Sequence, residues 1–359
     1  MIKVALIGAG MIATAAHIPA YRNHADIFSV EAVFDANPAV AAAVAEKHGI
    51  PHSYADIDQL FDEIQPDVVS VCVPNAFHKE YVKLGLECGA HVLCEKPLVA
   101  SYRDAVELFT LAKTLGKHLI TCQSMRYTPD RLAARAEIDN GLVGDVYYAS
   151  MSRVRRRGIP TWGRFHMKKH SCGGAFVDIG VHILDAMLWL MGNPEISAVM
   201  GSAMQNHKDE IGSLKESGAR TGKVDHARSF NPDEMDVEDF ASGILYFKNG
   251  ATAHICSAWA ANMPESNDIR IIGKKAGIFL PSGEIYSGKD SNTLLTPKLD
   301  IYEKEAFPGH FHIIDNLVDV LLHDKSPDVL PEQTIQVSQV LDMFYRSAEE
   351  GRVITPVDF

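Results

Sequence analysis

The sequence lacks an excess of basic residues and any long uninterrupted apolar run, and each absence excludes a class of protein. The formal net charge is −12 at pH 7, which disfavours nucleic acid or an anionic membrane as the main partner. No apolar run approaches the roughly 18 residues that a membrane helix requires. Met1 leads directly into a predicted strand, so the N-terminus leaves no room for a signal peptide. We therefore expect a cytoplasmic protein.

The sequence also lacks closely paired cysteines, internal repeats and low-complexity segments. Its six cysteines include no C-x-x-C motif, and Cys72, Cys94 and Cys122 fall in predicted buried strands. We expect reduced core thiols rather than disulfides or zinc ligands. The length of 359 residues, with 47% hydrophobic and 22% charged residues, is typical of a globular protein of about two to three domains.

A strand over residues 2–7 leads directly into a G-x-G-x-x-A pattern at the start of a predicted helix. Gly8 permits a tight turn, Gly10 lets the backbone approach a pyrophosphate, and Ala13 lets the helix pack closely on the strand. Met11 and Ile12 open the helix, where N–H groups without partners favour an anion. The position of the glycines between a strand and a helix predicts a dinucleotide site.

The next predicted strand ends at Asp35, 25 residues beyond Gly10. An acid at this position accepts hydrogen bonds from the adenosine ribose hydroxyls and repels a 2′-phosphate, so we expect NAD in preference to NADP. The alternative is that Asp35 only caps the helix that begins near Pro38.

A buried strand over residues 68–73 is followed by Pro74, Asn75 and His78. In open parallel sheets ligands bind at the carboxyl ends of the strands. We therefore expect these three residues to line the nicotinamide half of the cofactor site. For His78, a role in capping the next helix explains the pattern equally well.

The short buried strand over residues 92–94 ends abruptly in Glu95, Lys96 and Pro97. Pro97 biases Lys96 towards an extended backbone at the strand tip. The Lys96–Pro97 bond is also a candidate for a cis peptide, at a cost of about 0.5–1 kcal/mol. We expect Glu95 and Lys96 to face the cofactor; the alternative is a strand end with a solvated lysine.

The alternation of strands and helices predicts an α/β fold with a Rossmann doubly wound parallel sheet over residues 1–123. From residue 124 onward, period-2 segments predict an α+β substrate-binding and oligomerisation domain over residues 124–359, with a large, mostly antiparallel sheet. Residues 205–236 are expected to form a surface excursion, and C-terminal helices to pack back on the seam between the domains. The expected strands are 146–154, 197–204, 240–247, 251–258, 269–272 and 276–280, and the expected C-terminal helices are 317–322 and 333–348.

A predicted helix that reaches about residue 191 carries Asp178 and His182, which stand at i and i+4 and share one face. Asp185 lies on or near the same stripe. A buried Asp–His pair in an otherwise apolar helix is costly unless it is used chemically or satisfied by hydrogen bonds, and both explanations stay open. Because no third ligand stands at a suitable spacing, we expect no metal.

Four arginines stand between Arg153 and Arg157. Guanidinium groups recognise phosphate or carboxylate, but a strand with solvated or salt-bridged side chains explains the run equally well. The sequence does not decide between these explanations.

The pattern from Gly8 to Ala13, the Glu95-Lys96-Pro97 tripeptide and the D-x-x-x-H spacing resemble the motifs of the Gfo/Idh/MocA oxidoreductase family. The resemblance covers nearly the whole chain. It implies that Lys96, Asp178 and His182 form the catalytic set, and that the protein is a homodimer or homotetramer assembled through the open sheet face.

The stretch Ser124-Met125-Arg126-Tyr127 is similar to the N-x-R-Y stretch of that family, although Ser124 replaces the usual Asn. This similarity implies substrate contacts from Arg126 and Tyr127. Residues 155–160 resemble a subset of sugar dehydrogenases and do not define a substrate.

The resemblance implies an NAD-dependent dehydrogenase acting on a secondary hydroxyl of a sugar, sugar derivative or cyclitol. In such a reaction His182 is the best base for the hydroxyl proton, and Lys96 stabilises negative charge on the oxygen. Asp178 orients the substrate or steadies His182, and a cleft between the domains is expected to unite Lys96 with His182. Two alternatives are an NAD-dependent glycosidase of the same fold and a non-catalytic dinucleotide-binding regulator.

Overall fold

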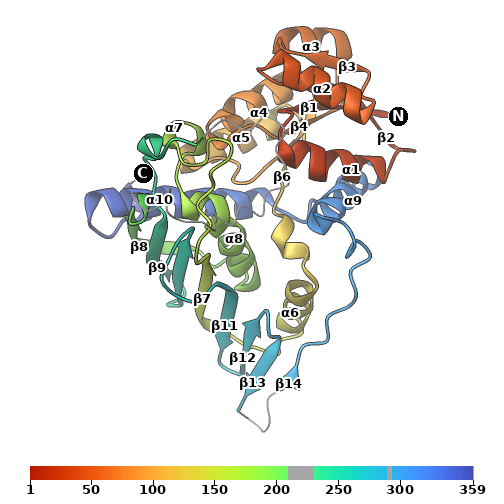
Figure 1. Ribbon diagram of the computed structural model, residues 1–359. Helices are drawn as coiled ribbons and strands as arrows, with labels where there is room; N and C mark the ends of the chain where they lie inside the picture. Colours follow the sequence, from red (N-terminus) through yellow and green to blue (C-terminus); the bar gives the residue numbers. More distant parts are fainter. Residues whose placement is uncertain (209–229, 289–292, 359) are drawn as a thin grey trace. The chain divides into compact units, whose positions relative to one another are not determined.

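The computed structural model describes residues 1–208, 230–288 and 293–358, and the chain forms two compact units (Figure 1). Residues 209–229 of the predicted surface excursion lie outside the described residues. The first unit comprises Met1–Val99, Arg103–Ser124 and Ile301–Ile335, and the second comprises Ala100–Tyr102, Met125–Asp300 and Gln336–Phe359.

Residues 301–335 depart from the sequence prediction, which assigned them to the second domain. They belong to the first unit, because helix α9 (Pro308–His323) packs against segment η1 (Ala13–His17) and helix α1 (Ile18–Arg22). The first unit is therefore built from two widely separated parts of the sequence.

The first unit contains a six-stranded parallel sheet in the order β3-β2-β1-β4-β5-β6. This order confirms the predicted Rossmann arrangement. Most residues of β1, β4, β5 and β6 are buried, and most of these are apolar, as expected for parallel strands. The elements are β1 (Ile2–Ile7), β2 (Phe28–Phe34), α2 (Pro38–His48), β3 (His52–Tyr54), α3 (Ile57–Ile64), β4 (Val68–Val71), η2 (Asn75–Phe77), α4 (His78–Glu87), β5 (His91–Cys94), α5 (Tyr102–Thr114) and β6 (Leu119–Thr121).

The second unit contains an eight-stranded sheet in the order β14-β13-β12-β11-β7-β10-β9-β8. Among the described strands of this second sheet, only the pairing of β7 with β10 is parallel. This confirms the prediction of a mostly antiparallel sheet. The last two strands were not predicted, because they are short. The strands are β7 (Val146–Val154), β8 (Ile196–Met204), β9 (Phe240–Phe247), β10 (Thr252–Ala258), β11 (Ser266–Gly273), β12 (Ala276–Leu280), β13 (Glu284–Ser287) and β14 (Thr293–Leu294).

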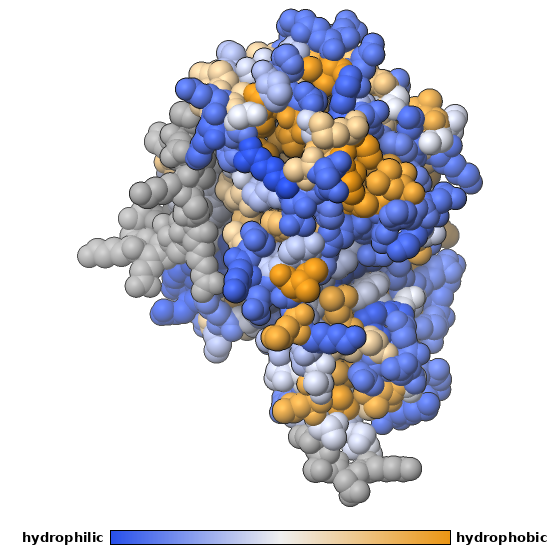
Figure 2. Space-filling view, turned by 90° about the vertical axis from the view of Figure 1, so that its right-hand side faces the viewer, coloured by the Kyte–Doolittle hydropathy of each residue, from blue (hydrophilic) through white to orange (hydrophobic). Residues whose placement is uncertain are grey.

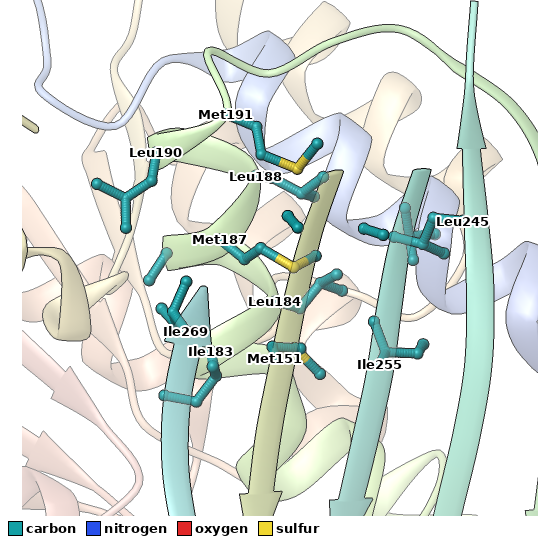
Figure 3. Close-up of a cluster of buried hydrophobic side chains, with 14 of the residues drawn as sticks. Met151, Ile183, Leu184, Met187, Leu188, Leu190, Met191, Leu245, Ile255 and Ile269 are labelled. Atoms are coloured by element: carbon teal, nitrogen blue, oxygen red, sulfur yellow. The ribbon is translucent and has the colours of Figure 1, made fainter. Parts of the chain in front are cut away.

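One face of this sheet is covered by helix α8 (Val181–Leu190), which packs Leu184 and Met187 against Met151 and Ile255 of the central strands (Figure 3). The segment Lys168–Leu190 is long and apolar enough to span a membrane by length and composition, but 83% of the tested window is buried inside the protein. It is packed as the core helix of the second unit. The remaining helical segments are η3 (Ser124–Tyr127), α6 (Pro129–Asp139), α7 (Lys168–Ser171), η4 (Phe176–Gly180), η6 (Pro232–Glu234), α10 (Pro331–Glu350) and η7 (Pro356–Asp358).

The surface turned to the viewer in Figure 2 is mostly hydrophilic, with hydrophobic residues gathered in limited areas. Large apolar side chains do reach solvent in places, for example Leu299, which is 87% exposed. Scattered exposure of this kind is normal for a folded protein.

Candidate functional site

The glycine turn (residues 8–10) has the shape that the sequence predicted. Gly8 has φ +102°, and a Cβ atom there would lie 2.7 Å from the carbonyl oxygen of Cys72. Only glycine therefore fits at this position. Gly10 is exposed, and a Cβ atom built on it would meet no other atom within 4 Å, so the turn leaves open space beside its backbone.

Asp35 lies beside this turn at the end of β2. Its Oδ2 atom accepts a hydrogen bond of 3.1 Å from the Ala9 N–H, and its Oδ1 atom accepts one of 2.9 Å from the Asn37 N–H. The capping of α2 comes instead from Asn37, which accepts from the Ala39 N–H. The Asp35 carboxylate is thus attached to the glycine turn, with Met11 exposed and Ile12 half-buried next along the chain. The open space at Gly10 and the acid at the second strand fit a dinucleotide.

His78 is buried and joins two strand tips. Its Nδ1 atom lies 2.8 Å from the carbonyl oxygen of Pro97, and its Nε2 atom lies 2.9 Å from that of Val73. Burial lowers the pKa of His78. The two ring nitrogens thus face carbonyl oxygens that follow β4 and β5. Of the residues predicted beside it, Pro74 is exposed and Asn75 is half-buried.

The Glu95 carboxylate is buried at the tip of β5, between two imidazoles. Nε2 of His17 lies 2.9 Å from Oε1, and Nε2 of His310 lies 2.8 Å from the same oxygen. Oε2 accepts a hydrogen bond of 3.2 Å from the N–H of Lys96. Burial alone would raise the pKa of Glu95, but the two histidines hold it well below its usual range. The sequence did not indicate a role for either histidine.

Lys96 follows Glu95 and is half-buried. The Lys96–Pro97 peptide is cis, as the sequence allowed. Lys96 thus follows the carboxyl end of β5, which lies between β4 and the edge strand β6.

In the second unit, Asp178 lies in η4 and His182 in the first turn of α8, and both are half-buried. The Nε1–H of Trp259 donates a hydrogen bond of 2.9 Å to Oδ2 of Asp178. The five residues of η4 form a π-helical turn, a local widening that is frequent at functional sites. The sequence did not indicate the contact with Trp259.

Asp185 and Arg126 form a bidentate ion pair inside the second unit. Nε of Arg126 donates to Oδ2 over 2.7 Å and Nη2 donates to Oδ1 over 2.6 Å, and the two side chains are 3% and 1% exposed. This ion pair holds η3 on α8. Tyr127, the neighbour of Arg126, is half-buried.

The start of η4 is held by a second buried carboxylate, Glu238. Its Oε2 atom accepts from the Gly174 N–H over 2.8 Å, and its Oε1 atom accepts from the Phe176 N–H over 3.0 Å. The hydroxyl of Tyr345 also donates to Oε1 over 2.8 Å. An acid at the first N–H groups of a helical segment satisfies donors that have no partner within the helix. Glu238 therefore positions the segment that carries Asp178.

The arginine run is placed at the end of β7 and just beyond it. Nη1 of Arg155 donates to the carbonyl oxygen of Gly158 over 3.3 Å, and Nη2 of Arg157 donates to Oδ1 of Asn262 over 2.7 Å. Arg153 is half-buried and Arg156 is exposed. The Arg155 contact is therefore local in sequence, whereas Arg157 connects the end of β7 to the segment that follows β10.

Two family models match the chain. The model described as "Oxidoreductase family, NAD-binding Rossmann fold" matches residues 2–122, and the model described as "GFO/IDH/MocA C-terminal domain" matches residues 132–279.

Curated proteins and solved structures are also similar to the chain. It is 32% identical over 355 residues to D-glucoside 3-dehydrogenase of Escherichia coli (strain K12), covering 98% of this chain and 96% of the relative. It is 24% identical over 362 residues to D-xylose 1-dehydrogenase (NADP(+)) 2 of Haloferax volcanii, covering 97% and 98%. The solved structure of levoglucosan dehydrogenase in complex with NADH and L-sorbose has a TM-score of 0.81 at 20% identity, covering 99% of this chain and 98% of that one. At this identity the structural likeness shows the shared fold.

Proposed function

Because the chain belongs to the Gfo/Idh/MocA oxidoreductase family, we propose that it is an NAD-dependent dehydrogenase acting on a secondary hydroxyl of a sugar or sugar derivative. One observation carries this proposal. The glycine turn, Asp35 and Lys96 all follow strands of one parallel sheet at their carboxyl ends, which is where open α/β sheets bind their ligands.

The proposed cofactor contacts follow from this edge of the sheet. The backbone at Gly8, Gly10, Met11 and Ile12 would hold the pyrophosphate. The Asp35 carboxylate would accept hydrogen bonds from the adenosine ribose and repel a 2′-phosphate. The Haloferax relative is named as an NADP(+) enzyme, so the proposed preference for NAD depends on Asp35 in this chain.

The nicotinamide half would be lined by Pro74, Asn75 and Lys96. In our proposal Glu95 and His78 support this edge through their hydrogen bonds to Lys96, Pro97 and Val73. When bound, NAD supplies the hydride acceptor or donor for the reaction.

The chain's own residues would handle the proton and the charge on oxygen. We assign His182 as the base that takes the hydroxyl proton, and Lys96 as the group that stabilises negative charge developing on the oxygen. Asp178, oriented by its hydrogen bond from Trp259, would orient the substrate or steady a protonated His182. Tyr127 is the proposed substrate contact from η3.

Glucosides are the first substrates to test, because the similarity to D-glucoside 3-dehydrogenase extends over nearly the whole chain. The purified protein would be incubated with NAD or NADP and a panel of methyl glucosides, free aldoses, anhydrosugars and inositols, and NADH formation followed by absorbance. We expect net NADH release with at least one sugar. Cleavage of the glycoside without net NADH release would indicate the glycosidase alternative, and binding of NAD without turnover of any sugar would indicate a regulator.

We further propose a cytoplasmic homodimer or homotetramer whose partner molecules are small sugars or polyols, with no nucleic acid and no membrane. The net charge of −12 supports the exclusion of polyanionic partners. The half-exposed face of the eight-stranded sheet supports self-association, as argued below.

A further inference from the structure

The strongest unassigned feature is a buried cluster of the first unit, which we call the Glu95 cluster: Glu95, His17, His310 and Cys122. The candidate ligand atoms of these four residues lie within 4.8 Å of one another. Glu95 is 7% exposed and the histidines are 1% and 7% exposed. His17 ends the segment that follows the glycine turn, His310 lies on α9, and Cys122 follows β6.

The composition of the cluster resembles a zinc site, but its distances do not. Zinc bonds of about 2.0–2.1 Å hold tetrahedral ligand atoms about 3.3 Å apart. Nε2 of His17 and Nε2 of His310 lie only 2.9 and 2.8 Å from Oε1 of Glu95, which are ordinary charge-assisted hydrogen-bond lengths. The thiol of Cys122 lies 4.0 Å from Nε2 of His17. The distances within the cluster are those of a carboxylate that accepts hydrogen bonds from two imidazoles.

We propose that Glu95 is a positioning residue that fixes the backbone of Lys96 and connects it to the segment following the glycine turn through His17 and to α9 through His310. This inference rests on the proposed role of Lys96 in the reaction. Each contact is specific to an atom: Oε1 receives the two imidazoles and Oε2 receives the N–H of Lys96. The carboxylate thereby joins the cofactor-binding turn to the lysine across the interior of one unit.

The protonation state of His17 follows from its burial. Burial lowers the pKa of His17, so its ring is neutral at pH 7 and donates through Nε2. Its Nδ1 atom is buried, with no hydrogen-bond partner among the described residues, which suits a bare nitrogen better than a second N–H. Because Glu95 is ionised, its two oxygens accept hydrogen bonds from three N–H groups, those of the two imidazoles and of the Lys96 backbone.

Glu95→Gln removes this charge at nearly constant volume and tests the geometry directly. An amide has only one oxygen, so an amide oxygen that accepts from both imidazoles leaves the amide N–H₂ facing the N–H of Lys96. Two donors then oppose each other, and the backbone at Lys96 must move. A misplacement of about 1 Å can cost about 10²-fold in rate.

The histidine variants separate hydrogen-bond donation from packing. In His310→Leu the donor is lost, whereas in His310→Gln the side-chain amide can still donate to Oε1; His17→Leu and His17→Gln form a second pair. His24→Leu is the matched control, because Nε2 of His24 also lies 2.7 Å from a carboxylate of α9, that of Asp315, away from Glu95.

Four quantities are measured for each variant: kcat, KM for the sugar, Kd for NAD by fluorescence titration, and the rate at which Lys96 is acylated by a dilute reagent, read by mass spectrometry. We expect Glu95→Gln and His310→Leu to lower kcat by about 10–10²-fold and to change the acylation rate of Lys96. We expect KM for the sugar and Kd for NAD to stay within about threefold, His310→Gln to recover most of kcat, and His24→Leu to match the wild type.

Unchanged kcat and unchanged Lys96 acylation in both Glu95→Gln and His310→Leu would overturn the inference. Failure of His310→Gln to recover kcat would also overturn it, since packing would then explain the effect. One equivalent of zinc retained after dialysis of the wild type would show a metal centre instead. Lys96→Met is run in parallel: if it keeps full turnover, the proposed function fails, while the acylation rates still decide whether Glu95 positions Lys96.

Discussion

A single carboxylate, Asp35, decides which dinucleotide the first unit accepts in our proposal. Changing Asp35 to Ser removes the charge that would meet a 2′-phosphate, so we expect the ratio of kcat/KM for NAD over NADP to fall by roughly tenfold. Asp26→Ser is the control, because Asp26 is exposed in the same unit. A wild-type enzyme that already prefers NADP would refute the assignment.

Lys96 and His182 are expected to act together on the substrate hydroxyl. Each single change to Ala should lower turnover by about 10²–10⁴-fold and leave the Kd for NAD nearly unchanged. Residues that act together are not additive, so the double variant should be little worse than either single one. Near-wild-type turnover of His182→Ala on the substrate found by the screen would contradict the assignment of the base.

The sequence predicted some residues of the Glu95 cluster and missed others. Glu95 and Lys96 were identifiable because the strand, the charged pair and the proline are adjacent in the sequence. The imidazoles that hold Glu95 were not, because His17 and His310 lie 78 and 215 residues away from it. A contact between residues so far apart in the chain leaves no recognisable pattern in the local sequence.

At the scale of elements, the position of η4, which carries Asp178, depends on the close approach of Gly174 to Glu238. A Cβ atom on Gly174 would lie 1.9 Å from the carbonyl oxygen of Glu238, so Gly174→Ala cannot be accommodated without moving the backbone. We expect a loss of about 3 kcal/mol or more in the free energy of unfolding. Gly288→Ala is the control, since no atom lies within 4 Å of its Cβ position. Equal melting temperatures for the two variants would contradict this account.

The elements themselves were mostly readable from the sequence. Buried runs bounded by glycine and polar residues predicted the parallel strands, and period-2 patterns predicted most of the second sheet. β13 and β14 were missed because strands of 4 and 2 residues carry too few alternations to stand out. The π-helical turn at 176–180 was also missed, because it changes the spacing of a helix without changing its composition.

At the scale of the whole molecule, one face of the eight-stranded sheet is only half-buried in the single chain. Met200, Ile244 and His254 are direct cross-strand neighbours on that face, and Met200 and Tyr246 are 38% and 41% exposed. Apolar exposure along a sheet is typical of an interface. Light scattering should therefore show a dimer or tetramer at micromolar concentration.

Substitution of that face tests the same prediction. Ile244→Glu places a charge between Met200 and His254 on that face and should shift the population towards monomer. Leu299→Glu is the control, because Leu299 is 87% exposed. A wild-type protein that is monomeric at micromolar concentration would refute the assembly.

The lowered pKa values of three histidines predict how the stability of the protein depends on pH. Burial lowers the pKa of His91 from 6.5 to about 4, and burial also lowers the pKa of His17 and of His78. Between pH 6.5 and pH 4 these three histidines therefore bind more protons in the unfolded chain than in the folded chain, and their contribution to stability is lost as the pH falls. Urea unfolding at pH 7 and pH 5 measures this loss.

One variant isolates the share of His91 in that loss. His91→Asn keeps an acceptor for the N–H of His118, which donates to Nδ1 of His91 over 3.0 Å, but it does not titrate. The loss of stability between pH 7 and pH 5 should be smaller in His91→Asn than in the wild type. His323→Asn, at an exposed position of α9, is the control, and an equal reduction in both variants would contradict the prediction.

The return of residues 301–335 to the first unit has a consequence for synthesis on the ribosome. At about 5–20 residues per second, roughly 10–40 seconds separate the emergence of residue 123 from that of His310. During this interval all six strands of the first sheet have been synthesised. His310, one of the two histidines that contact the Glu95 carboxylate, has not. The dinucleotide-binding unit therefore finishes its interior only after almost the entire second unit has been translated.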